Sequence, residues 1–264
     1  MAGLARRDAS QIARQLGRLL EPAATEIAYP GVWLREDVYA MHGHYLDAHG
    51  TVPTFERLAA GLMARLAGPI PDPARPDDYE AVLAPVYAWI SATAERAADG
   101  RAAAGAGHAV KMWQALSGGG RRPLRARMLA GLFPLGVLGI NRAGLGPVKP
   151  DLRGPELRRS ALLALAEACR RLGLVPPHLV FGHSHRTGML PGDDPAEWRT
   201  PAGTRLHNAG NWVFETHFMG HGPPGSSPYW PGGAIALDDD DAPPRLERLL
   251  QDVPAEELRG PGRA

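Results

Sequence analysis

The sequence contains one cysteine, no excess of charge of either sign and no long uninterrupted apolar segment. The single thiol, Cys169, cannot form an internal disulfide, which fits a reducing compartment. The 29 lysine and arginine residues nearly balance the 28 acidic residues, so no net field favours nucleic acid. The longest apolar run, 128–140, contains Pro134 and three glycines, and a membrane-spanning helix needs roughly 20 apolar residues. We therefore expect no transmembrane segment and no nucleic-acid preference, with the cytoplasm as the default location.

The residues that are present predict a folded chain with three regions. Its 264 residues are 44% apolar and 22% charged, which is typical of a globular protein with a sizeable core. The region up to about residue 47 ends in two β-like runs, and the region from about 51 to 173 has mainly helical periodicity. Beyond it, short runs separated by Gly, Asn and Asp turns predict a sheet rather than βαβ units. The predicted strands fall in 31–36, 37–44, 178–185, 204–215, 232–241 and 244–250.

Three segments of the middle region carry the 3.6-residue rhythm of amphipathic helices. They are 55–66, 77–98 and 157–172, and Gly173 stands where a helix C-cap belongs. Cys169 falls on the apolar face of the last helix, which predicts a small buried core residue. The stretch 117–140, rich in Gly, Arg and Pro, has loop signals and an apolar patch, and is predicted to be a lid or an internal packing element.

Two histidine motifs carry the chemical information. His42-Gly43-His44 and Gly182-His183-Ser184-His185 each follow an apolar β-like run, so each places imidazoles at the end of a buried strand. Sites of open α/β sheets lie beyond strand ends, and neutral imidazole is a good ligand for zinc, manganese or iron. A lone histidine at a strand end is more often a hydrogen-bonded structural residue. Two such motifs, both flanked by glycine, favour a metal site.

These motifs resemble a known family. Residues 181–185 resemble the GHxH motif of calcineurin-like metallophosphoesterases, and residues 42–44 resemble the histidine motif that precedes it. Residues 207–212 look like the strand and turn that follow GHxH, and an insert between the motifs is similar to the branch that includes UDP-2,3-diacylglucosamine hydrolases. The resemblance spans about 27–250. It implies an α/β fold, a metallophosphoesterase-type β-sandwich flanked by helices with its N-terminal part missing, so that 1–264 forms one partial domain with a helical insert at about 51–173.

The resemblance also implies a dinuclear metal site of the Mn, Zn or Fe class. His42 and His183 would bind one divalent ion and His185 the other, and two ions about 3.5–4 Å apart would clamp a phosphoester and activate water. His44 would contact the substrate phosphate or cap its strand. Asn208 would orient a ligand or close a turn. The implied substrate is a small-molecule or lipid-like phosphoester.

The acidic motifs of the same family are not found. The family supplies oxygen ligands from DxH, GDxxD and GNH motifs in its N-terminal half. Asp47-Ala48-His49 spells DxH but follows the first histidine motif, and Gly192-Asp193-Asp194 follows GHxH, so neither stands in the family's position. A catalytic zinc ion normally has three protein ligands, so we expect weak or partial metal binding and negligible hydrolysis by this chain.

The leading interpretation is a metal-dependent phosphoester hydrolase, of which this chain is a truncated or late-started version. The alternative is a non-catalytic remnant that acts as a binding or interaction module. Two further interpretations are a half-enzyme completed by another polypeptide and a lipid-surface element at 121–140. Among the remaining histidines, His207 is predicted near the site, where it would support a ligand without contacting the ion. The others are predicted at the surface or in loops: His49, His108, His178, His217 and His221.

Overall fold

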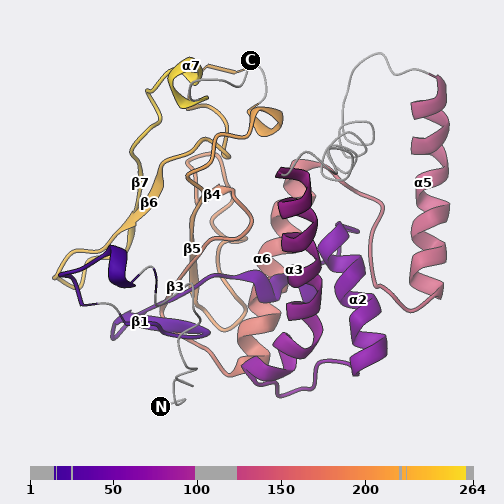
Figure 1. The fold of residues 1–264 in the computed structure, drawn as a ribbon, viewed down its shortest axis with the longest axis horizontal. Helices are drawn as coiled ribbons and strands as arrows, with labels where there is room; N and C mark the ends of the chain where they lie inside the picture. The colour runs from indigo at the N-terminus through magenta and orange to yellow at the C-terminus, as the bar shows by residue number, and fades with distance from the viewer. Residues whose placement is uncertain are drawn as a thin grey trace.

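The protein, in a computed structural model, has a mixed α/β fold in which helices cover one side of a five-stranded sheet (Figure 1). The structure describes residues 15, 17–24, 26–98, 124–219, 222–223 and 225–259. The strands are β1 (Gly31–Arg35), β2 (Val38–Met41), β3 (His178–Phe181), β4 (Thr187–Gly188), β5 (Arg205–Ala209), β6 (Gly233–Ala236) and β7 (Arg245–Arg248). The helices are η1 (His44–Ala48), α2 (Phe55–Ala67), α3 (Pro76–Ala98), α5 (Leu124–Arg142), α6 (Gly154–Leu172), η2 (Thr216–Phe218) and α7 (Ala255–Leu258).

The main sheet has the strand order β1-β2-β3-β5-β4 and is partly parallel. β2 pairs parallel to β3, and β3 pairs parallel to β5, while β1 and β4 run antiparallel to their neighbours. The predicted strands are confirmed, and among the described residues no α-helix connects the strands from β3 to β7, as expected for this region; the parallel pairing of β2 with β3 was not predicted. The helices between β2 and β3 form the crossover that a parallel pair requires, and they return the chain to the same end of the sheet.

The core lies between this sheet and the helical layer. Tyr39 and Leu179 face it from β2 and β3, and Leu165 and Cys169 face it from α6, each less than 5% exposed. The predicted buried position of Cys169 is confirmed, and burial raises the pKa of its thiol to about 12. Gly173 caps α6 with a φ of 67°, in the left-handed conformation that glycine adopts without a steric penalty.

Helix α5 differs most from the sequence-based prediction. Residues 124–142 form one continuous helix that includes Pro134, whereas residues 117–123 of the predicted stretch lie outside the described residues. The helix stands at the outer edge of the helical layer (Figure 1), with Val137 buried and Leu132 and Leu135 exposed. It is therefore not an internal packing element. Among the described residues, no helix is long and apolar enough to cross a membrane.

Candidate functional site

The two histidine motifs lie at the same edge of the sheet. His42 and His44 follow β2, while His183 and His185 follow β3, and the two strands are parallel neighbours. Because parallel strands end at the same edge, the sheet brings the two motifs together. The backbone ties them directly, since the amide of Gly182 donates to the carbonyl of His42 at 3.1 Å.

Three imidazoles form a close group, which we call the histidine cluster: His42, His44 and His183. The ring centroids of His42 and His183 are 5.0 Å apart, and those of His44 and His183 are 6.4 Å apart. The Nδ1 atoms of His42 and His44 are 3.2 Å apart. Two nitrogens on one tetrahedral zinc ion lie about 3.3 Å apart, because each Zn–N bond is about 2.0–2.1 Å long. The spacing of His42 and His44 thus fits a shared cation as well as a hydrogen bond.

The loop after β3 holds its histidines in a conformation that side chains rarely adopt. His183 has a φ of 65° and His185 a φ of 57°, and among the described residues they are the non-glycine positions with positive φ. A left-handed backbone at a side-chain-bearing residue costs of the order of 1 kcal/mol and concentrates at functional sites. The matching turn after β2 uses Gly43, with a φ of 103°, which tolerates this conformation.

Carboxylates contact three of the four motif histidines. Nε2 of His183 donates to Oδ2 of Asp47 at 2.8 Å, and Asp47 is only 7% exposed. His44 Nε2 is paired with Glu80 at 3.3 Å, and His185 Nδ1 with Glu215 at 3.2 Å. A histidine whose one ring nitrogen donates to a carboxylate has its other nitrogen oriented and available, which is the arrangement around most metal-ligating histidines.

Helix α3, in the predicted insert, supplies one side of this site. Glu80 and Tyr87 are seven residues apart on α3, about two turns, and therefore share one face. The Tyr87 hydroxyl donates to the Asp47 carboxylate that also accepts from His183, and Tyr29 donates to Glu80. Burial, and then the Asp47 charge, raise the pKa of Tyr87, so this hydroxyl keeps its proton at neutral pH.

The environment keeps the two histidines after β2 neutral. Burial, followed by the neighbouring rings of His42 and His183, lowers the pKa of His44 to about 4. Burial is also the largest cause of the lowered pKa of His42, followed by the nearby His183. Neutral imidazole carries the lone pair that a metal ion requires, so these rings are in the form that can bind a cation.

His185 and Asn208 lie at the margin of the site. The side chain of His185 is 46% exposed and turns towards Glu215. Asn208 is 2% exposed; its amide donates to Ser184 Oγ at 2.7 Å, and its carbonyl accepts from the Gly210 amide at 2.9 Å. Asn208 therefore closes the turn after β5 and fixes the loop that carries His183.

These described residues do not complete a metal centre. No group of three or more His, Cys, Asp or Glu side chains in the described part of the chain is arranged to hold a metal ion. Asp47 and Glu80 lie beside histidines and occupy their ring N–H groups, so they do not serve as free oxygen ligands. The two-ion site that the family resemblance implies is therefore not fitted by these residues.

Several participants were not identified from the sequence. Asp47 was set aside because its DxH context lies in the wrong place, yet its carboxylate contacts His183. Glu80, Tyr87 and Glu215 were also missed, since they lie 30 or more residues from their partners. Asp193, from the second acidic motif that was set aside, accepts a hydrogen bond from Arg186 and forms an ion pair with it.

The remaining histidines correct the sequence-based assignment in part. His178 is buried in β3, and its Nδ1 lies 2.9 Å from Nε2 of His207, so the two form a pair on the sheet. Predicting His178 at the surface was wrong, and His207 contacts this partner rather than the histidine cluster. His49 is half-buried against Tyr79, whereas His108, His221 and the side chain of His217 lie outside the described residues.

No protein-family model matches the chain, and comparisons with curated proteins and with solved structures likewise give no match.

Proposed function

We propose that this chain carries the histidine part of a divalent-metal site belonging to a phosphoester hydrolase. The observation that carries the proposal is the convergence of His42, His44 and His183 from the ends of two parallel strands. Carboxylates orient His44 and His183 and leave one nitrogen of each ring for a cation. Phosphoester chemistry is added by the GHxH resemblance, while the geometry supports cation binding.

The proposed site has two kinds of residue, those that bind the ion and those that orient the imidazole rings. His42 and His183 are the proposed ligands of the ion, and His44, whose Nδ1 lies 3.2 Å from that of His42, lies beside them without completing a three-ligand group. Asp47 holds a proton on His183 Nε2 and fixes the ring, as Glu80 does for His44. His185, at the exposed margin, is paired with Glu215 and is not assigned to the ion.

The chain alone is expected to bind metal weakly, because no three-residue ligand group is formed among the described residues. A binding or interaction module is the second candidate function. It is favoured by apolar side chains that face solvent around the sheet: Trp212 is 62% exposed, Val213 60% and Leu34 51%. The two candidates differ in whether removing a cluster histidine changes any activity.

Calorimetric titration with Mn²⁺ and Zn²⁺ tests the proposal. The wild-type chain should bind with modest affinity, and His183→Ala should weaken binding by about tenfold or more through loss of one ligand. His207→Ala is the matched control, because it removes an imidazole that contacts His178 and not the cluster. Equal binding by the wild type and His183→Ala would exclude the proposed site.

Hydrolysis is measured on the same proteins. With manganese, turnover of bis(p-nitrophenyl) phosphate should be negligible for this chain, since the acidic ligands are missing from the described site. Robust turnover that disappears in His183→Ala would show that the account of an incomplete ligand set is wrong. Metal binding that depends on His183, without turnover, is the expected combination.

A further inference from the structure

A cavity of about 540 Å³ lies in the helical layer, next to η1 and α2 and separate from the histidine cluster. Its polar lining consists of Arg57, Arg65, Arg171 and His49, a group that we call the arginine pocket. In the described part of the chain, no aspartate or glutamate lines it. The remaining lining is small or apolar and includes Gly61, so space is left beside the guanidinium groups.

Arg57 is the central residue of this pocket. It is 6% exposed, and its Nε donates to the Gly50 carbonyl at 2.7 Å. No carboxylate is paired with Arg57 among the described residues, and burial lowers the pKa of its guanidinium. The guanidinium of Arg57 lines the cavity, where no described residue supplies a counter-charge. A buried charge without a partner is costly, so an anion bound here would be stabilising.

Gly61 keeps the space at this guanidinium open. A Cβ at position 61 would lie 3.1 Å from Nη1 of Arg57 and 2.7 Å from the Leu145 carbonyl oxygen, too close for a side chain. Glycine at this position therefore allows α2 to approach the connection that follows α5. The same absence of a side chain leaves the Arg57 guanidinium reachable.

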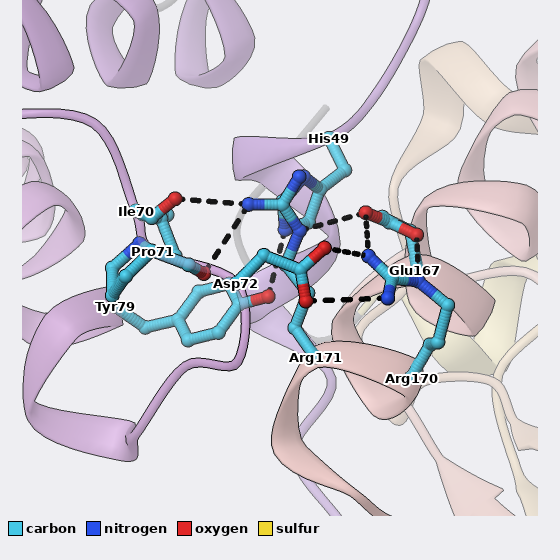
Figure 2. Close-up of polar contacts among 8 residues, drawn as sticks. All are labelled: His49, Ile70, Pro71, Asp72, Tyr79, Glu167, Arg170 and Arg171. Carbon is cyan, nitrogen blue, oxygen red and sulfur yellow. Dashed lines mark hydrogen bonds and ion pairs between the residues drawn. The ribbon is translucent and has the colours of Figure 1, made fainter.

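Arg171 is different, because its charge is balanced (Figure 2). Its Nε donates to Glu167 at 2.7 Å and its Nη1 to the Ile70 carbonyl at 2.9 Å. Glu167 also accepts from Arg170, which is paired with Asp72. Two carboxylates thus balance the charge of two arginines, and this network fixes one wall of the pocket.

The unbalanced positive charge comes from Arg57 and Arg65. Arg65 donates to the Ala143 carbonyl and, like Arg57, has no carboxylate partner among the described residues. His49 contributes no charge at neutral pH, since burial, followed by the charge of Arg171, lowers its pKa to about 4. Two cations with no counter-charge remain around a cavity without acidic lining.

We propose that the arginine pocket binds a small organic dianion, either a phosphate monoester or a dicarboxylate. Guanidinium groups recognise both oxyanions through paired N–H donors, and the cavity volume suits a small molecule. Such a ligand would supply the counter-charge that Arg57 and Arg65 lack. The proposal does not rest on the proposed hydrolase function, because no residue of the histidine cluster lines the pocket. Asp47 of η1 contacts His183, whereas the next two residues of the chain, Ala48 and His49, line the pocket.

The experiment titrates the full chain with glycerol 3-phosphate and, separately, with malonate, at ionic strength held constant with sodium chloride. Arg57→Met should weaken binding about tenfold or more, the loss expected for a charge-assisted hydrogen bond. Ala64→Glu places a carboxylate in the lining and should abolish binding. Arg159→Met is the control, because it removes an exposed arginine of α6 outside the pocket, and it should bind as the wild type does.

The location is checked by the imidazole NMR resonances of His49, which should shift on saturation while those of the His178 and His207 pair stay unchanged. If Arg57→Met fails to fold, Ala64→Glu and Arg65→Met decide the result. Binding of one ligand alone identifies the source as phosphate or carboxylate and supports the site. No binding of either at about 10 mM, which would detect a millimolar Kd, overturns the proposal. So does equal weakening by Arg159→Met.

Discussion

Residues of η1 contribute to both the histidine cluster and the lining of the arginine pocket, and the two sites differ in where the acidic side chains are placed. At the cluster, Asp47 contacts His183, and Glu80 contacts His44, whose pKa burial lowers to about 4. At the pocket, Arg57 is buried with no carboxylate beside it among the described residues. The carboxylates at the cluster orient imidazole nitrogens towards a cation. The lack of a carboxylate at the pocket leaves the charge of Arg57 available to an anion.

The comparison shows that burial alone does not define a functional group. Arg186 is almost as buried as Arg57, but two of its nitrogens donate to the Asp193 carboxylate at 2.6 and 3.0 Å. Its charge is therefore used within the fold. Whether a buried ionisable group has an internal partner is what distinguishes structural residues from candidate binding residues here.

The largest predicted effect comes from breaking the ion pair between Arg186 and Asp193. Arg186→Met should lower the free energy of unfolding by about 3 kcal/mol, because it removes two of the charged donors to the buried Asp193 carboxylate and leaves Arg158 as its remaining ion-pair partner. Arg57→Met should change it by less than about 1 kcal/mol, since no buried carboxylate is left behind. Urea unfolding of both variants gives the comparison. Similar losses in the two would mean that Arg57 has a partner that this account lacks.

The next effect concerns the acid beneath the cluster. Asp47→Ala should destabilise the fold by about 2 kcal/mol, because the Tyr87 hydroxyl and His183 Nε2 both lose their acceptor. Asp151→Ala is the control, since its partner Arg153 is 80% exposed and such solvated pairs contribute little to stability. Equal stabilities of the two variants would contradict the supporting role of Asp47.

A smaller effect appears as a dependence on pH. Burial lowers the pKa of His44, His49 and His207 to about 4, below the ordinary value of 6.5. Between these values the unfolded chain binds more protons than the folded one, so stability should be full above pH 6.5 and fall as the pH drops towards 5. Urea unfolding at pH 7, 6 and 5 measures this. His207→Gln should make the dependence shallower, and an unchanged slope would show that His207 is not buried in solution.

The smallest effect is expected at the exposed margin of the cluster. His185→Ala removes a pair with Glu215 in which the histidine side chain is 46% exposed, so stability should change by less than about 1 kcal/mol. The substitution should not relieve the backbone strain of the positive φ at position 185, because alanine also has a Cβ and is strained in the left-handed conformation. A loss above that limit in thermal or urea unfolding would place His185 among the structural residues.

The sequence predicted local features well and distant partners poorly. Apolar runs identified β2 and β3, and helical spacing identified the buried face of α6, since these patterns repeat over a few residues. Parallel pairing of β2 with β3 was missed because register depends on a crossover of more than a hundred residues. Glu80 approaches His44 from another element, and no local signal marks such a contact.

Some missed features left a trace in the sequence. His178 and His207 occupy strand positions whose side chains face the same side of neighbouring parallel strands, so period-two alternation would have placed them together. Asp47 lies five residues after His42, within reach of the site once η1 turns the chain back. Arg57 gave no such signal, because its burial depends on Gly61 and on a connection nearly ninety residues later in the chain.

The most direct test of the metal proposal follows histidine imidazole resonances during a titration with Mn²⁺. A paramagnetic ion at the cluster should broaden the resonances of His42, His44 and His183 first. His178 is the internal reference, because it begins β3, about 10 Å along the strand from Phe181, whereas His183 follows the other end of that strand. Selective broadening of the cluster is the predicted result. Broadening of His178 together with the cluster, or of none of these rings, would contradict the assignment of His42, His44 and His183 as a cation site.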